Sequence, residues 1–317
     1  MKGERNMKIH IITVLLLTFF SSSIMAQETK EVKDPYAVEE EMETRDLFND
    51  GKIHLIVRLD DIGFCHGVNE AFEKVANEGV VSAVSVIVNT PWLDEAVEIL
   101  KEHPEISVGL HTCLNSEWTP YKWGSVLPAK EVPSLVDQWG NFFPSRKLFM
   151  DNKPDLNEFE KELRAQLNLA IAKGLNLSYM DHHMSAAVET PAMQEIFEGL
   201  AKEYGLAISR WFGETQADSI YSVTPEAKAD ILVENINKLE KPGTYLLVCH
   251  IGTNNPEMAA LIDLNPGGLK NMSVHRAAET NALCDPRLKK VIQDKDIEVV
   301  GYDVFQKNFL DEMINPN

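Results

Sequence analysis

Two adjacent carboxylates, Asp60 and Asp61, directly follow the apolar run 53–59. The run has the length of a buried strand, and α/β folds carry out their chemistry at the carboxyl ends of strands. Each negative charge opposes ionisation of its neighbour, and a bound cation would remove that cost. The pair by itself is as often a solvated turn or a helix N-cap, so it needs support from elsewhere in the chain.

Three further apolar runs end in histidine. His111 follows 108–110, His182 and His183 follow 177–181, and His250 follows 245–249. A single histidine in an apolar stretch is more often a core residue than a ligand. Four strand ends that each carry Asp or His are hard to explain as core packing, and in a barrel such ends converge on one face. The four segments together therefore predict a metal site.

Strand and helix patterns alternate along the chain without an internal repeat. We expect strands at 53–59, 80–88, 107–111, around Tyr179, and at 207–209, 244–249 and 297–302. We expect helices at 69–78, 93–102, 155–173, 191–204, 225–239 and 275–284. Residues 114–154, rich in aromatic residues and interrupted by Pro and Gly, predict a long functional loop. The order predicts an α/β fold, a (β/α) barrel-like single domain of mostly parallel strands.

The N-terminus carries an export pattern. Lys8 precedes the apolar run 9–20, and small residues lead to a predicted cut after Ala26, so we interpret residues 1–26 as a signal peptide. An uncleaved anchor is the alternative, but the run is short for a membrane span. We therefore expect a bacterial protein that is periplasmic or secreted, without stable membrane insertion after cleavage. Residues 27–50 are predicted to form an acidic leader, and residues 51–317 the barrel domain.

The chain is acidic, with 49 Asp and Glu against 30 Lys and Arg and a formal net charge of −19. This balance argues against nucleic acid and anionic membrane surfaces as partners. The four cysteines, Cys65, Cys113, Cys249 and Cys284, include no close pair of the kind that a cysteine-rich zinc site needs. Disulfide pairing and the oligomeric state, a homodimer included, stay open at this stage.

In order and spacing, these segments resemble the YdjC-like carbohydrate deacetylases, which include the chitooligosaccharide deacetylases. The resemblance runs from about Ile53 to about Tyr302. Its pieces are DDIGFCHGVNEAF (from Asp60), GLHTCL (from Gly109), SEWTPYKWGSV (from Ser116), ELRAQL (from Glu162), MDHH (from Met180), CHIG (from Cys249) and HRAAETNAL (from His275). The resemblance implies a barrel-like fold and hydrolytic removal of acetyl groups from N-acetylated sugars or oligosaccharides.

The same resemblance implies a divalent metal held by one Asp and two His, which by position are Asp61, His111 and His183, with Asp60 as the catalytic carboxylate. The third family motif usually reads Asp-Ser-His-x-His, where this chain has Asp181-His182-His183-Met184-Ser185. Cys65-His66 stands where Ser-Pro is frequent, and Ile251 where Pro is usual. These departures leave the implied ligand set whole. His66 and His182 are expected to face solvent, with a role as extra ligands left open.

The chemistry also follows from the residue types. An amide resists water at neutral pH, and a divalent cation with three protein ligands and an open position activates both the water and the carbonyl. Two His and one carboxylate suit zinc best, with magnesium or a first-row transition-metal ion as alternatives. Asp60 would accept the proton from water, and His250 is the candidate general acid. His250 as a purely structural strand-end histidine is the alternative.

Other side chains are candidates for supporting roles. Asp181 would orient a ligand imidazole or cap a helix. Arg276 would bind substrate or pair with Asp60, and an ion pair with Glu279 three residues on is equally compatible with the sequence. Trp118 and Trp123 would stack on pyranose faces, as would Trp139, although each alone fits loop packing as well.

We favour a metal-dependent carbohydrate N-deacetylase over two alternatives. One is another carbohydrate-active hydrolase on the same barrel, an esterase or a glycosidase. Glycosidases use two carboxyl groups about 5 to 9 Å apart, whereas Asp60 and Asp61 are adjacent in sequence beside histidines that suit a metal better. The other is a non-catalytic glycan-binding protein, against which the intact set of site residues argues. The sugar and its chain length do not follow from the residues.

Overall fold

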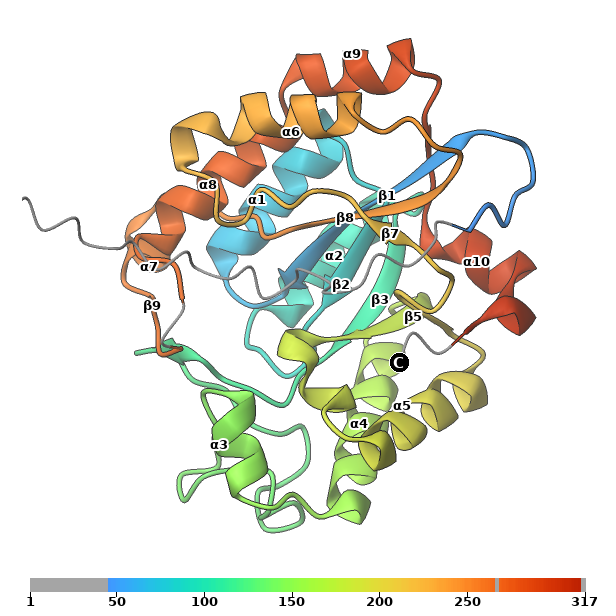
Figure 1. Ribbon diagram of the computed structural model, residues 1–317. Coiled ribbons are helices and arrows are strands. Elements are labelled where there is room, and N and C mark those ends of the chain that lie inside the picture. The colour runs from blue at the N-terminus through green and yellow to red at the C-terminus, as the bar shows by residue number, and fades with distance from the viewer. Residues whose placement is uncertain (1–44, 266–267, 315–317) are drawn as a thin grey trace, which may run out of the picture. The chain divides into compact units, whose positions relative to one another are not determined.

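A curled sheet of parallel strands forms the centre of the structure, a computed structural model that describes residues 45–265 and 268–314 (Figure 1). The predicted signal peptide and most of the predicted leader lie outside the described residues. From one edge to the other the strands are β6 (Ala207–Ile208), β5 (Leu177–His182), β3 (Ser107–Thr112), β2 (Ala83–Val86), β1 (Ile53–Ile62), β8 (Gly243–Cys249) and β7 (Thr215–Gln216). β10 (Glu298–Val299) pairs with the first residues of β1.

The sheet is curled because its two edges must approach each other. β6 and β7 lie at opposite edges, yet only residues 209–214 connect them. Six connecting residues cover at most about 24 Å. Seven flat strands would be about 29 Å wide. The sheet therefore bends toward a half-barrel, which confirms the predicted mostly parallel, barrel-like α/β fold.

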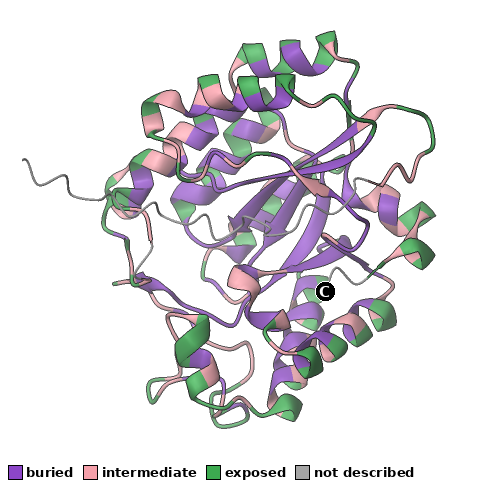
Figure 2. Ribbon diagram, in the orientation of Figure 1, coloured by how far each residue is buried: buried purple, intermediate pink, exposed green. Residues whose placement is uncertain are grey.

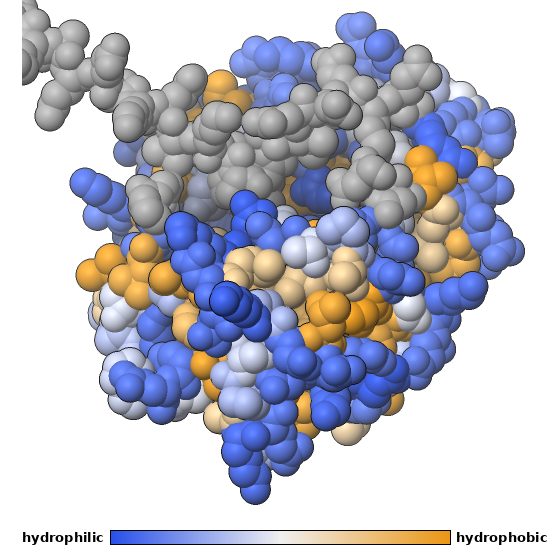
Figure 3. All heavy atoms as spheres, turned by 60° about the horizontal axis from the view of Figure 1, so that its bottom comes forward, coloured by the Kyte–Doolittle hydropathy of each residue, from blue (hydrophilic) through white to orange (hydrophobic). Residues whose placement is uncertain are grey.

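Helices cover the outside of the sheet, and their apolar sides face it (Figures 1 and 2). The longer ones are α1 (His66–Glu78), α2 (Leu93–Glu102), α4 (Leu156–Ala172), α5 (Pro191–Tyr204), α6 (Lys228–Asn237), α8 (Met272–Leu283), α9 (Pro286–Asp294) and α10 (Tyr302–Asn308). Short helices are α3 (Arg146–Asp151) and α7 (Pro256–Ala259), with 3-10 turns at His183–Val188, Pro225–Ala227 and Leu310–Glu312. Hydrophilic side chains predominate on the face turned forward in Figure 3. Within the described residues, no helix combines the length and apolarity that a membrane crossing requires.

Helix α4 illustrates how the local sequence sets an element. Asp155 caps its N-terminus by accepting from the backbone N–H groups of Asn157 and Glu158. Phe159, Leu163 and other residues at helical spacing are buried on one side. The helix therefore begins at a capping carboxylate and is held against the sheet by one apolar stripe.

The C-terminal region and the long loop differ from the sequence-based expectation. The expected strand 297–302 is limited to β10, and helix α10 begins at Tyr302. Helix α9 was not expected, although Asp285 before Pro286 is a helix-start pattern. The segment 114–154 contains α3 and strand β4 (Trp118–Thr119), which pairs antiparallel with β9 (Ile262–Asp263). All four cysteines are free thiols.

Candidate metal centre

The two carboxylates at the end of β1 point to the same place because the strand is irregular there. In a regular strand, adjacent side chains point to opposite faces. Between Leu59 and Ile62 the register with β2 shifts, and Asp61 has a positive φ of 67°. Asp60 Oδ2 and Asp61 Oδ1 consequently lie 4.0 and 3.6 Å from the same atom, His111 Nε2. The bulge therefore brings both carboxylates to the same side of the sheet, whereas in a regular strand they would point to opposite faces.

Asp61, His111 and His183 meet at the carboxyl ends of β1, β3 and β5. Asp61 Oδ1 is 3.6 Å from His111 Nε2 and 3.2 Å from His183 Nδ1, and all three residues are buried. Among the described residues, none of these three atoms has a hydrogen-bond partner. Two ligands on a tetrahedral zinc ion lie about 3.3–3.6 Å apart, from bond lengths of 2.0–2.2 Å. The three atoms that lack partners therefore fit a divalent cation.

A buried carboxylate orients each of the two imidazoles from behind. His111 Nδ1 lies 2.8 Å from Asp181 Oδ1, and His183 Nε2 lies 3.0 Å from Glu117 Oε2. If each of these nitrogens carries the proton, the other nitrogen of the ring is an acceptor aimed at the site. Asp181 thus lies where the sequence predicted an orienting carboxylate. Glu117 was missed, because it belongs to the loop before β4 and no spacing relates it to His183.

The same carboxylates perturb the histidines electrostatically. Burial would lower the pKa of His111, but Asp181 and Asp60 raise it above its ordinary value. Burial opposes protonation of His183 as well, and Glu117 still raises the pKa of that imidazole well above the ordinary value. The site therefore attracts positive charge, as either protons or a cation.

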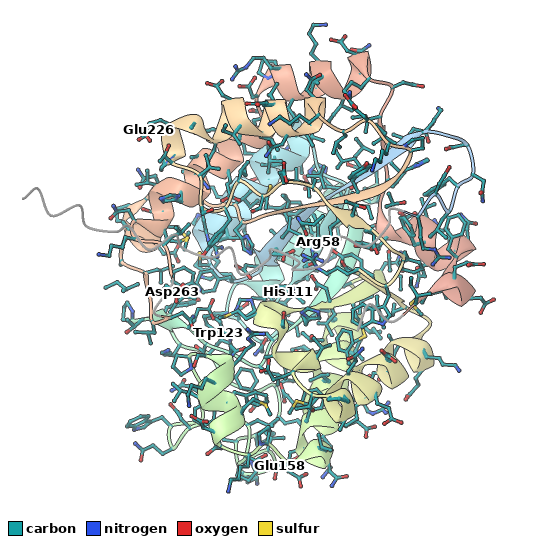
Figure 4. The ribbon with its side chains drawn as sticks, viewed as in Figure 1. Arg58, His111, Trp123, Glu158, Glu226 and Asp263 are labelled. Carbon is teal, nitrogen blue, oxygen red and sulfur yellow. The ribbon has the colours of Figure 1, made fainter. Side chains whose placement is uncertain are left out.

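Asp60 is held by Arg58, two residues earlier on β1. Arg58 Nε donates to Asp60 Oδ1 at 2.7 Å, and Nη2 donates to Oδ2 at 2.8 Å. Its Nη1 donates to Ser209 Oγ at 2.6 Å and lies 3.1 Å from Asp181 Oδ2. Arg58 therefore links the proposed base to the carboxylate behind His111. The labelled side chains Arg58 and His111 lie at the centre of the fold in Figure 4. Sequence reasoning missed Arg58, although a charge inside an apolar strand was a signal for it.

Arg276 pairs with Asp61, which differs from both partners considered for it, Asp60 and Glu279. Its Nη2 donates to Asp61 Oδ2 at 2.7 Å, and its guanidinium lies 5.4 Å from the centre of the Trp118 ring. Burial would raise the pKa of Asp61, but Arg276 and His183 hold it well below the ordinary value. Asp61 is therefore ionised, with Oδ2 held by Arg276 and Oδ1 left to the site.

His250 directly follows the last residue of the neighbouring strand β8. Its backbone N–H donates to Glu279 Oε2 at 2.7 Å, and Glu279 Oε1 accepts from Lys228 Nζ at 3.0 Å. The Tyr221 ring lies 5.6 Å from the imidazole, edge to face. Burial lowers the pKa of His250, although the Asp61 charge opposes this. His250 is therefore a buried, predominantly neutral imidazole fixed by its own backbone.

Two of the three tryptophans predicted to contact sugar are packed into the interior. Trp118 and Trp123 are 3% and 4% exposed, and both lie against Phe64. The Trp123 indole N–H points to Cys113 Sγ at 3.3 Å. Trp139 is 76% exposed. Burial gives Trp118 and Trp123 a packing role and leaves the prediction of stacking on pyranose rings without support.

The two additional histidines have unlike environments. His66 is exposed, as expected, and its Nδ1 lies 2.9 Å from Glu95 Oε1. His182 was expected to face solvent, but it is only partly exposed. Its ring packs 6.1 Å from that of Phe197, and burial lowers the pKa of His182 to about 4. Neither belongs to the groups of side chains whose atoms converge on a common point.

The chain is similar to known proteins over most of its length. A family model described as YdjC-like protein matches residues 54–294. A protein of Brevibacillus brevis named carbohydrate deacetylase is 31% identical over 259 residues, which are 78% of this chain and 98% of that protein. A carbohydrate deacetylase of Geobacillus stearothermophilus is 26% identical over 261 residues, or 80% of this chain and 98% of its own length.

One solved structure supports the fold. It is the crystal structure of an Enterococcus faecalis protein to which cleavage of cellobiose phosphate has been provisionally ascribed. It superposes with a TM-score of 0.65 and 21% identity, over 80% of this chain and 99% of that one. Similarity at this level of identity establishes the shared barrel-like architecture.

Proposed function

The chain belongs to the YdjC-like protein family, and from this premise we propose that it is a metal-dependent hydrolase that removes acetyl groups from N-acetylated sugars or oligosaccharides. Relatives named carbohydrate deacetylase match along nearly their whole length. The observation that carries the proposal is the set of three buried ligand atoms without partners on Asp61, His111 and His183, next to the carboxylate of Asp60.

Asp61, His111 and His183 would hold the ion, with zinc as the best fit to the donor set and magnesium or a first-row transition-metal ion as alternatives. A divalent cation there would polarise the acetyl carbonyl and make a bound water more acidic. The outer carboxylates Asp181 and Glu117 keep both imidazoles in the orientation and tautomer that ligation requires.

Asp60 is the proposed proton acceptor. Its two oxygens accept hydrogen bonds from Nε and Nη2 of Arg58, and this bidentate contact keeps the carboxylate oriented toward the attacking water. His250 is the proposed proton donor to the departing amine nitrogen. Because burial lowers its pKa, its protonated form would give up a proton readily.

Arg276 is the proposed contact to substrate. Its Nε and Nη1 are buried and have no hydrogen-bond partner among the described residues, while Nη2 is fixed by Asp61. Buried guanidinium donors without acceptors are costly, and a carbonyl or hydroxyl oxygen of the substrate would supply the acceptor. Arg276 would therefore orient the substrate and hold a metal-binding carboxylate with the same side chain.

Acetate release from N,N′-diacetylchitobiose and longer N-acetylated oligosaccharides tests the function. We expect acetate in the presence of zinc, no acetate in excess EDTA, and recovery when zinc is restored. Asp60→Asn should bind zinc and release little acetate, whereas the matched surface variant Asp94→Asn should behave as wild type. Activity that persists in EDTA, or that survives Asp60→Asn, would contradict the mechanism and favour a metal-independent hydrolase.

Export is part of the same proposal. The pattern at residues 1–26 supports a periplasmic or secreted enzyme whose substrate is a glycan met outside the cytoplasm. Fractionation of expressing cells, with the N-terminal residue of the protein determined from each fraction, tests it. Cleavage after Ala26 is the expected result, and an intact N-terminus in the cytoplasm would contradict export.

A further inference from the structure

A second group of histidine and carboxylate side chains lies at the opposite end of β1 from the metal centre. His54 is the second residue of β1, Asp50 belongs to the preceding segment, and Glu298 on β10 is the register partner of His54. Asp60 lies six positions after His54 along the strand, a distance of about 20 Å. The group is therefore separate from the catalytic site.

The three side chains converge on one point. His54 Nε2 lies 3.4 Å from Asp50 Oδ2 and 3.4 Å from Glu298 Oε2. The His54 side chain is 0% exposed, and neither of its nitrogens has a hydrogen-bond partner among the described residues. A buried imidazole without partners is costly, so the arrangement calls for something to satisfy it.

The spacing differs from that of the hydrogen-bonded histidine–carboxylate pairs in the same structure. Four hydrogen-bonded pairs of the described residues, His111–Asp181, His183–Glu117, His66–Glu95 and His103–Glu105, have distances of 2.8, 3.0, 2.9 and 3.2 Å. The atoms that face the metal centre are instead 3.2 and 3.6 Å apart and make no hydrogen bond. The contacts of His54 at 3.4 Å match this second class, as expected of ligand atoms around a cation.

Neighbouring groups hold the three ligands in place. The Phe48 ring stacks on the His54 ring, with centres 3.8 Å apart and planes at 12°, and fixes the plane of the imidazole. Lys52 Nζ donates to Glu298 Oε1 at 2.5 Å, which turns Oε2 toward His54. Thr244, the register partner of His54 on β8, has a buried hydroxyl with no hydrogen-bond partner among the described residues.

The local charge favours a divalent cation. Asp50, Glu298 and Asp296 contribute three negative charges against one positive charge on Lys52. An imidazole ligates a metal in its neutral form, so the balance of −2 equals the charge that a divalent ion would neutralise. An imidazole with two carboxylates suits zinc or another first-row ion better than calcium, which prefers oxygen ligands alone.

We propose that Asp50, His54 and Glu298 form a second divalent-cation site, for zinc or a similar first-row ion. Bound there, the ion ties the segment that precedes β1 to the strand β10 near the C-terminus. Because this site is far from Asp60, the bound ion has a structural role. An ion that binds only the folded chain stabilises it by RT ln(1 + [L]/Kd), where [L] is the free ion concentration.

Zinc stoichiometry of the purified full chain, free of any histidine tag, tests the site. The protein is stripped with chelator, titrated with zinc and analysed for bound metal. We expect two ions in wild type, one in His111→Ala, one in Glu298→Gln and none in the double variant. Asp296→Asn is the matched control, because it removes the same charge beside Lys52 from a carboxylate that is no ligand, and it should bind two.

A thermal readout uses the same variants. Excess zinc should raise the Tm of His111→Ala and leave that of the His111→Ala, Glu298→Gln double variant unchanged. Glu298 is half-exposed, so its amide variant is expected to fold. Any of three results would overturn the proposal. Glu298→Gln could bind two ions, His111→Ala could bind none, or Glu298→Gln and Asp296→Asn could lose the same number of bound zinc ions. None of these outcomes depends on acetate release, so they leave the proposed function untouched.

Discussion

Glu117 offers a sharp test of the metal centre, because it contacts the site through one atom pair. Its Oε2 lies 3.0 Å from His183 Nε2, and its side chain is buried. Asp181, by contrast, also accepts from Ser85 and lies against Arg58, so its removal would disturb several interactions at once. Replacing Glu117 therefore isolates the effect of the carboxylate behind a ligand imidazole.

The size of the effect follows from what each replacement removes. Loss of an outer carboxylate lowers metal affinity about 10–100-fold, which corresponds to roughly 1.4–2.8 kcal/mol. In Glu117→Gln the amide oxygen still accepts from His183 without the charge, so we expect a loss near tenfold. In Glu117→Leu the Nε2–H is left buried without an acceptor, so we expect a loss near 100-fold.

The assay is competition for zinc against a chromophoric chelator at neutral pH. Glu95→Gln is the matched control, because Glu95 makes the same kind of contact at 2.9 Å with His66, which is outside the site. The control should bind zinc as wild type does. Affinities within about threefold of wild type for both Glu117 variants, well under the worth of a charged hydrogen bond, would refute the role of Glu117 and of this geometry.

Three further predictions follow from the same contacts. Burial opposes protonation of His111 and His183, but neighbouring carboxylates raise the pKa of both imidazoles. Protonation of these histidines therefore stabilises the metal-free protein. This stabilisation is complete below about pH 6.5 and is lost as the pH rises through the raised pKa values. Zinc must displace these protons, so its affinity should increase over that range and binding should release protons, measured by calorimetry in two buffers of different ionisation enthalpy; zero release would contradict the assignment. Arg58→Gln leaves Asp60 and Asp181 without their buried cation and should lower the free energy of unfolding by about 3–5 kcal/mol in denaturant titrations, and a loss below about 1 kcal/mol would contradict the pairing. His250→Gln should reduce acetate release about 10²–10⁴-fold with zinc affinity retained, whereas unchanged turnover would leave His250 a structural role only.

The sequence by itself determined which strand ends carry chemistry. Apolar runs of strand length each end in Asp or His, and this local pattern is visible without any contact being known. Because parallel strands place their carboxyl ends at one edge of a sheet, the fold class predicted that these ends converge, and the family resemblance selected Asp61, His111 and His183 among them. Most helices also followed from local periodicity, with α2 and α5 at their predicted bounds. The short β10 and the start of α10 at Tyr302 did not, because the apolar run there continues across the boundary.

Only the tertiary structure decided which groups support these residues. Glu117 lies 66 residues from His183, and Arg276 lies 215 residues from Asp61. Side-chain partners at such separations leave no periodic trace in a sequence, since packing selects them after the elements have assembled. For the same reason the aromatic loop residues Trp118 and Trp123 looked like sugar contacts and proved to be buried. The positive φ of Asp61, which brings both carboxylates to one side, is likewise a property of the paired strands and is absent from the order of the residues.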